Sequence, residues 1–220
     1  MKVNIVVTIF LSIIFSGCKK DKINIYEEVY EVEFVSIWSQ SSHPTDFPSG
    51  AHFSPMAAIS HVAGLDVIGV GLLATEGVQI MAETGNTEQL LKEFDDFRVL
   101  QYGLDKEVGK SFDVPGNDKI EIGVERGRHN VTVFSMIAPS PDWFVAATTS
   151  LVDPSDGLWY DEVTVYATSY DAGTDSGASF SSTDIATNPK EAVRIINSGP
   201  LTEGTDSVQY MAKFIFRRIK

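Results

Sequence analysis

Alternating apolar and polar residues predict that this chain is rich in β-strands. Residues 29–37 place Tyr30, Val32 and Phe34 on one side of an extended segment and Glu31 on the other. A period of two is typical of a strand that buries one face. Other segments are apolar or alternating over the length of a strand: residues 67–73, 120–125, 131–138, 143–147, 162–168 and 209–219.

Two segments have helical rather than strand periodicity. Residues 76–83 and 87–97 are short helix candidates, and the second places Leu90 and Phe94 four residues apart, after an Asn or Thr that can cap it. Residues 39–55 are rich in proline and serine and predict turns. With about seven or eight strands separated by turns, we predict an all-β fold, an antiparallel β-sandwich with short helical inserts.

The first residues have the pattern of an export signal. Lys2 supplies a positive charge, and residues 3–15 are almost wholly apolar. This run is shorter than the about 20 residues that span a bilayer, but it has the length of a signal-peptide core. Two small residues then precede Cys18, which resembles the bacterial lipobox. We therefore expect residues 1–17 to be a lipoprotein signal peptide and Cys18 to carry lipid; an ordinary secretory signal is the alternative.

The cysteine count supports an anchored protein, and the charge narrows the class of partner. Cys18 is the only cysteine, so no internal disulfide can form, and lipid attachment gives this thiol a use. Loss of residues 1–17 removes one of the 17 Lys and Arg and none of the 30 Asp and Glu, so the net charge changes from −13 to −14. A surface this acidic excludes nucleic acid as a partner. Residues 18–25 are expected to form a polar tether, and residues 26–220 one domain.

The loop at residues 170–177 carries the most informative chemistry. It reads YDAGTDSG, with Asp171 and Asp175 four residues apart in a loop that has two glycines, after a predicted strand. Carboxylates on a tight loop suit a hard cation such as calcium, but the loop is not an EF-hand, because Ser176 and Ser182 stand where that motif needs Gly and Glu. Taken alone, a loop of this kind is more often a turn with ordinary solvated carboxylates than a metal site. Asp142 lies in a second rigid turn, between two prolines and Trp143.

Several segments together resemble a known family. They are YEVEF at 30–34, HP at 43–44, AHFS at 51–54, ATEGV at 74–78, PSPDWFV at 139–145, GLW at 157–159 and YDAGTDSG at 170–177. In this order, over roughly residues 30–217, the sequence resembles the spondin domain of the F-spondin and mindin family. The segments at 139–145 and 170–177 are the most specific. Cysteines that animal members carry near Trp159 are absent, and so are their thrombospondin-type repeats.

This resemblance implies a β-sandwich with one bound calcium ion, whose ligands here are Asp142, Asp171 and Asp175. Calcium takes about six to eight oxygens, so carbonyls or waters must complete the shell. The resemblance also implies a binding or adhesion module rather than an enzyme. We expect a monomer that is held to the outer membrane through its lipid only and faces either the periplasm or the outside, with a protein or glycan ligand at the cell surface.

Two other interpretations follow from the residues. The protein could be a structural envelope lipoprotein without a ligand of its own. It could also be a serine hydrolase, because GTDSG at 173–177 is faintly similar to a serine-protease nucleophile segment, with Ser176 as nucleophile and His52 as base. The context expected around such a histidine is missing, since Phe53, Ser54 and Pro55 follow it.

Overall fold

The computed structural model describes residues 26–202 and 210–220, which form eleven strands and two helices. In chain order these are β1 (Glu28–Ser36), β2 (His52–Phe53), β3 (Ala57–His61), α1 (Glu76–Thr84), α2 (Glu88–Val99), β4 (Gly103–Val108), β5 (Phe112–Asp113), β6 (Asn117–Val124), β7 (Asn130–Ala138), β8 (Trp143–Ser150), β9 (Glu162–Asp171), β10 (Arg194–Ile195) and β11 (Ala212–Arg218). The expected signal peptide and tether, with Cys18, lie outside the described residues.

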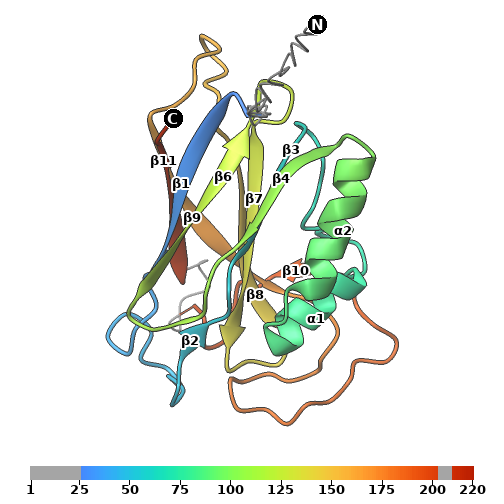
Figure 1. Ribbon diagram of the computed structural model, residues 1–220. Coiled ribbons are helices and arrows are strands. Elements are labelled where there is room, and N and C mark those ends of the chain that lie inside the picture. The colour runs from blue at the N-terminus through green and yellow to red at the C-terminus, as the bar shows by residue number, and fades with distance from the viewer. Residues whose placement is uncertain (1–25, 203–209) are drawn as a thin grey trace, which may run out of the picture.

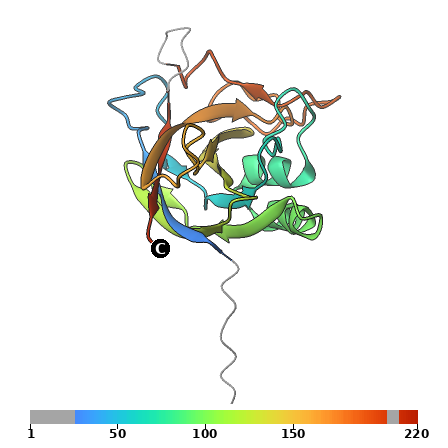
Figure 2. The same ribbon diagram turned by 90° about the horizontal axis from the view of Figure 1, so that it is seen from above.

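The long strands form one antiparallel sheet that folds over on itself. Their order is β4-β3-β7-β8-β9-β11-β1-β6, and β9 belongs to both layers: Glu162–Ala167 pairs with β11, and Thr168–Asp171 pairs with β8. Seen from above, the strands make a nearly closed ring, with both helices on one side of it (Figure 2). The predicted all-β class is confirmed, and the two layers of the sandwich are parts of one continuous sheet.

Side chains close the gap between the two edge strands, β4 and β6. The Asp105 carboxylate accepts the Gly123 amide at 2.8 Å, and the Ser60 hydroxyl donates to the Gly123 carbonyl at 2.8 Å. The Ser60 oxygen also accepts the Asp105 amide at 3.0 Å, and the Tyr26 hydroxyl donates to Asp105 at 2.9 Å. Because these groups satisfy buried polar atoms at both edges, the sheet closes without a continuous backbone ladder.

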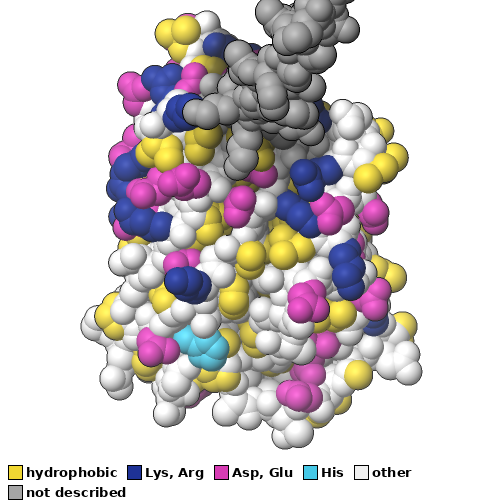
Figure 3. Space-filling model, viewed as in Figure 1, with side chains coloured by type: hydrophobic (Ala, Val, Ile, Leu, Met, Phe, Trp, Pro, Cys, Tyr) yellow, Lys and Arg dark blue, Asp and Glu magenta, His cyan; other side chains and the backbone are white. Residues whose placement is uncertain are grey.

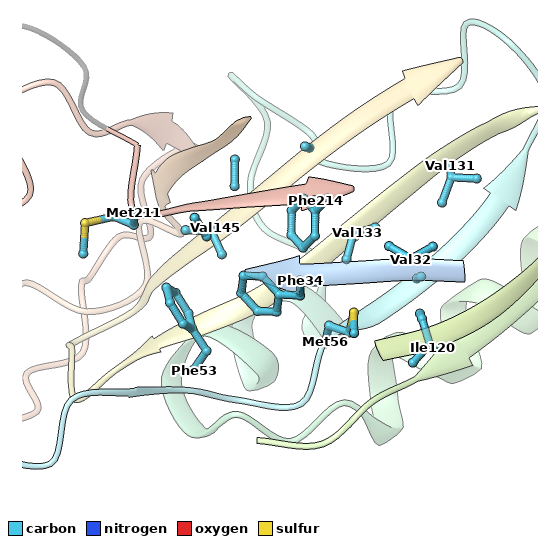
Figure 4. Close-up of a cluster of buried hydrophobic side chains, with 14 of the residues drawn as sticks. Val32, Phe34, Phe53, Met56, Ile120, Val131, Val133, Val145, Met211 and Phe214 are labelled. Atoms are coloured by element: carbon cyan, nitrogen blue, oxygen red, sulfur yellow. The ribbon is translucent and has the colours of Figure 1, made fainter. Parts of the chain in front are cut away.

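Aromatic and aliphatic side chains fill the space between the layers (Figure 4). Phe34 from β1 lies at its centre, with ring centroids 4.8 Å from those of Phe53 and Phe214 and 4.9 Å from that of Phe112. The alternation predicted for β1 is confirmed, since Tyr30, Val32 and Phe34 are fully buried. A core of this size explains how the domain folds without a disulfide.

β7 does not alternate as β1 does, because β7 buries both of its faces. One face of β7 points between the layers, and the other carries Phe134 beneath α1 and α2, where it packs against Phe94 and Phe144. A strand that buries both faces has no reason to alternate. The two helices can pack closely because Gly77 has no side chain; a Cβ there would lie 2.6 Å from the Leu90 Cα. Thr75 caps the start of α1 by accepting the Val78 amide. Both predicted helices are confirmed.

One predicted strand is wrong and five strands were missed. Residues 67–73 form turns, because Gly69 and Gly71 adopt positive φ angles of 76° and 83°, and the Asp66 carboxylate accepts two backbone amides there. The longer strands that the pattern did not predict are β3, which is buried on both faces, and β4, which becomes exposed in its second half. The two-residue strands β2, β5 and β10 are too short to leave a pattern.

Candidate metal centre

The strand ends bring Asp142 and Asp171 together. Asp142 immediately precedes β8 and Asp171 ends β9, and in this antiparallel pair Trp143 lies opposite Asp171. The Ala172 amide donates to the Asp142 carbonyl at 3.1 Å and continues the pairing into the loop. This end of the sandwich is opposite the end at which β1 begins and the chain terminates (Figure 1).

Asp142 is the deepest of the three carboxylates and has no exposed surface. Its Oδ2 accepts the amides of Thr174 at 2.7 Å and Asp175 at 3.0 Å, and the Thr174 hydroxyl at 3.3 Å. Its Oδ1 has no hydrogen-bond partner. Burial raises the pKa of Asp142 to about 6, the backbone amides oppose that rise, and the negative charge of Asp171 adds to it. A positive charge beside Asp142 would therefore stabilise its ionised form.

Asp171 is paired with a cation that the sequence did not suggest. Its Oδ1 accepts the Gly173 amide at 2.8 Å, and its Oδ2 accepts from the Arg194 guanidinium at 2.8 Å. Arg194 reaches it because β10 pairs with the end of β9. Gly173 has a φ of 72°, and a Cβ there would lie 2.4 Å from the Glu191 carbonyl oxygen, so the loop requires glycine at this point.

Asp175 holds the loop together. Its Oδ1 accepts the Gly177 amide and its Oδ2 the Ile185 amide, each at 2.7 Å. The Ser176 amide in turn donates to the Ile185 carbonyl at 2.8 Å. Asp175 is only 8% exposed. Its carboxylate therefore joins two separate parts of the loop that follows β9.

The three aspartates differ in how free they are to bind an ion. Asp171 and Asp175 line an open pocket of about 530 Å³, and Asp142 lies beneath the loop that they form. Among residues 26–202 and 210–220, no group of three His, Cys, Asp or Glu side chains is arranged to hold a metal ion as it stands. The donor set fits a hard cation, because it is made of oxygens and includes the unpartnered Oδ1 of Asp142. The three-carboxylate calcium site stays a prediction.

The residues of the hydrolase interpretation have other neighbours. The Ser176 hydroxyl contacts the Thr187 hydroxyl at 2.9 Å, and the His52 Nδ1 contacts the Gly50 carbonyl at 2.8 Å. Both contacts are hydrogen bonds, and a structural role explains each of them.

Sequence reasoning missed Arg194 and Thr174 at this site. Arg194 is 23 residues beyond Asp171, in a segment without strand periodicity, so nothing in the sequence indicated the contact. Thr174 lies inside the YDAGTDSG segment, and its amide is what orients Asp142. Backbone amides cannot be assigned to a carboxylate before the loop conformation is known.

The fold and the site define an all-β domain with buried carboxylates gathered in the loops at one end. The chain belongs to the Spondin_N family, which its sequence matches over residues 28–213. It is 31% identical to spondin-2 of Homo sapiens over 193 residues, which cover 82% of this chain and 56% of that protein. It is 29% identical to spondin-1 of Gallus gallus over 202 residues, which cover 86% of this chain and 25% of that protein.

The family predicted from the sequence motifs is thereby confirmed. This chain spans about a quarter of the length of the spondin-1 relatives that it matches. Neither α1 nor α2, the two helices of the described residues, is long and apolar enough to cross a membrane.

Proposed function

We propose that this protein is a lipid-anchored binding module of the bacterial cell envelope whose ligand-binding loops hold one calcium ion. The observation that carries the calcium proposal is Asp142, a carboxylate with no exposed surface and with an Oδ1 that has no partner. A buried carboxylate is costly unless a cation or hydrogen bonds compensate its charge. Calcium near Asp142 and Asp171 would supply that charge.

The ion would share the site with Arg194. The guanidinium of Arg194 already contributes one positive charge at Asp171, and more than half of its side chain is exposed. Such a side chain can move into solvent at little cost. Calcium would then replace it at the Asp171 carboxylate, while carbonyls or waters complete a shell of about six to eight oxygens.

The loops around the site offer a surface for a protein or glycan ligand. The pocket beside Asp171 and Asp175 is lined by hydroxyl, amide and charged groups, including Thr187, Asn197 and Arg194. Groups of this kind form hydrogen bonds that fix the orientation of a polar ligand. Membership of the Spondin_N family supports a binding rather than a catalytic role.

Titration calorimetry on the purified, metal-free mature protein tests the proposal. We expect one calcium ion to bind to the wild-type protein, and Asp171→Asn to abolish binding. Asp161→Asn is the matched control, because Asp161 is an exposed aspartate at the opposite end of β9 and should leave binding unchanged. Absence of binding by the wild-type protein at millimolar calcium would refute the calcium site.

A pull-down from the native envelope, with calcium and with chelator, tests the binding role. A partner that is captured only with calcium would support a module whose ligand binding depends on calcium. If nothing is captured under either condition while the ion still binds, the structural envelope lipoprotein is the better description.

A further inference from the structure

Five exposed apolar side chains lie at one end of the sandwich, which we call the tether end. It consists of the start of β1, the β6–β7 and α2–β4 turns, the β8–β9 loop and the C-terminal residues. The side chains are Val99, Leu100, Tyr102, Leu158 and Ile219, which are 78%, 61%, 49%, 61% and 51% exposed. Figure 3 shows hydrophobic side chains in yellow at the upper right, where α2 ends.

Hydrogen bonds hold these segments side by side. The Arg128 guanidinium in the β6–β7 turn donates to the Gly103 carbonyl at the start of β4, at 3.0 Å. Arg126 in the same turn donates to the Gly157 carbonyl in the β8–β9 loop. The Ile219 amide donates to a carbonyl of β1 at 2.9 Å. The exposed apolar side chains are therefore carried on one connected end of the domain.

The chain enters the domain at this same end. In the sequence, Cys18 precedes the first described residue by eight positions, and eight residues reach at most about 25–30 Å when fully extended. If Cys18 carries lipid, the tether end is the part of the domain that stays nearest to the bilayer. A short tether also gives this end a high effective concentration at the membrane surface, so weak contacts suffice.

The charges of the tether end favour a neutral membrane surface. Arg128 pairs with Glu125 at 2.6 Å, and Arg126 lies 3.8 Å from Glu27, so these arginines are compensated within the protein. Acidic residues also flank Leu158 in the β8–β9 loop, which would repel anionic headgroups.

Aromatic residues add to the fit with a membrane. Tyr102 is half exposed at the α2–β4 turn, and the Cζ atom of Arg126 lies over the Trp159 ring, 5.0 Å from its centroid. Tyr and Trp are the residues that favour the boundary between headgroups and acyl chains.

We infer that the tether end lies against the surface of the bilayer that holds the lipid of Cys18, with its exposed apolar side chains among zwitterionic headgroups. The inference rests on the lipid anchor of the proposed function. It fixes the orientation of the domain. Since β9 has ten residues and a strand rises about 3.3 Å per residue, the aspartates at its far end project about 30 Å from the membrane.

Site-specific labelling of the lipidated full-length protein in phosphatidylcholine vesicles tests this inference. A lipidated Cys18 has no free thiol, so Leu100→Cys, Leu158→Cys and the control Ile185→Cys each present one thiol for an environment-sensitive fluorophore. Ile185 is 58% exposed and lies beside Asp175 at the opposite end. We expect nitroxide-labelled lipids to quench the fluorophore several-fold at positions 100 and 158 and not at 185. Adding phosphatidylglycerol should not strengthen the quenching.

The experiment distinguishes failure of the docking from failure of the lipid anchor. One label per chain with equal quenching at all three positions, or with none at 100 and 158, would overturn the docking and leave the anchor intact. Two labels per chain would show that the Cys18 thiol is free, which removes the anchor and the docking with it. Stronger quenching with phosphatidylglycerol would refute the neutral-surface argument.

Discussion

Replacing Asp142 by Asn isolates the charge of one buried carboxylate. The variant has nearly the same shape, and its side-chain oxygen can still accept the amides of Thr174 and Asp175. What changes is that no negative charge develops at this position as the pH rises. In metal-free buffer the two proteins should therefore differ chiefly in how their stability depends on pH.

The structure gives the sign and the size of that difference. Burial raises the pKa of Asp142 from its ordinary value of 3.8 to about 6, so the folded protein holds this proton more tightly than the unfolded chain. Below about pH 4 both states are protonated and there is no penalty. As the pH rises from about 4 to about 6, the unfolded state ionises first and wild-type stability falls, by about 3 kcal/mol at 1.36 kcal/mol per pKa unit.

The Asn variant lacks this loss but carries a cost of its own. Its amide nitrogen replaces the Oδ1 that has no partner, and an unsatisfied buried donor costs about 1–3 kcal/mol at every pH. The absolute stabilities at neutral pH should therefore lie close together. The informative quantity is the wild-type minus Asp142→Asn difference, which should become about 3 kcal/mol less favourable to the wild type between about pH 4 and about pH 7.

Urea unfolding at a series of pH values measures this difference directly. Calcium supplies a second signal, because an ion that binds only the folded state adds about 2.7 kcal/mol at a hundred times its Kd. The wild type should gain this at neutral pH and Asp142→Asn should not. A difference that stays flat with pH in metal-free buffer would refute the argument that the Asp142 carboxylate is uncompensated.

Four further changes test separate parts of the account. Asp175→Ala removes two hydrogen bonds from backbone amides to a charged carboxylate, so urea unfolding should show the metal-free protein destabilised by about 2–3 kcal/mol. Asp175→Asn should destabilise it less. Equal stability of the wild type and the Ala variant would contradict the role of Asp175 in joining the two parts of the loop. Arg194→Met removes the cation that competes at Asp171, so calorimetry should show several-fold tighter calcium binding, whereas Arg194→Lys should stay near the wild type. Cys18→Ser should release the protein from the membrane fraction or leave it unprocessed, and normal processing and fractionation of this variant would disprove the lipid anchor. Fluorophosphonate probes should not label the folded protein; labelling that disappears in Ser176→Ala would establish a hydrolase.

The predictable part of the fold is the part that buries one face of each strand. β1 and β6 alternate because one side meets the core and the other meets water, and both were found from this pattern. β3 reads AAISH and is buried on both sides, so it has no alternation, and its two alanines are not residues that favour strands. Residues 67–73 show the opposite error, because apolar residues there belong to a loop bent at Gly69 and Gly71.

The candidate site was predictable in its acidic residues but not in their partners. The sequence places Asp142 and Asp171 at the ends of two strands, and the family resemblance linked them. Their approach depends on β8 and β9 being neighbours, which local periodicity does not encode. Arg194 reaches the site only through the two-residue strand β10, which is too short to leave a pattern.

The backbone contacts of the aspartates bear on how calcium would act. Five amides donate to Asp142, Asp171 and Asp175, so these carboxylates already organise the loop without an ion. A metal-free protein should therefore keep its fold, in contrast to small domains whose structure depends on the ion. What calcium can change is the balance of charge, since Asp142 is uncompensated at Oδ1 and Arg194 is held by Asp171. Displacement of that arginine would alter the charge of the pocket, and the ion would thereby tune ligand binding rather than permit folding.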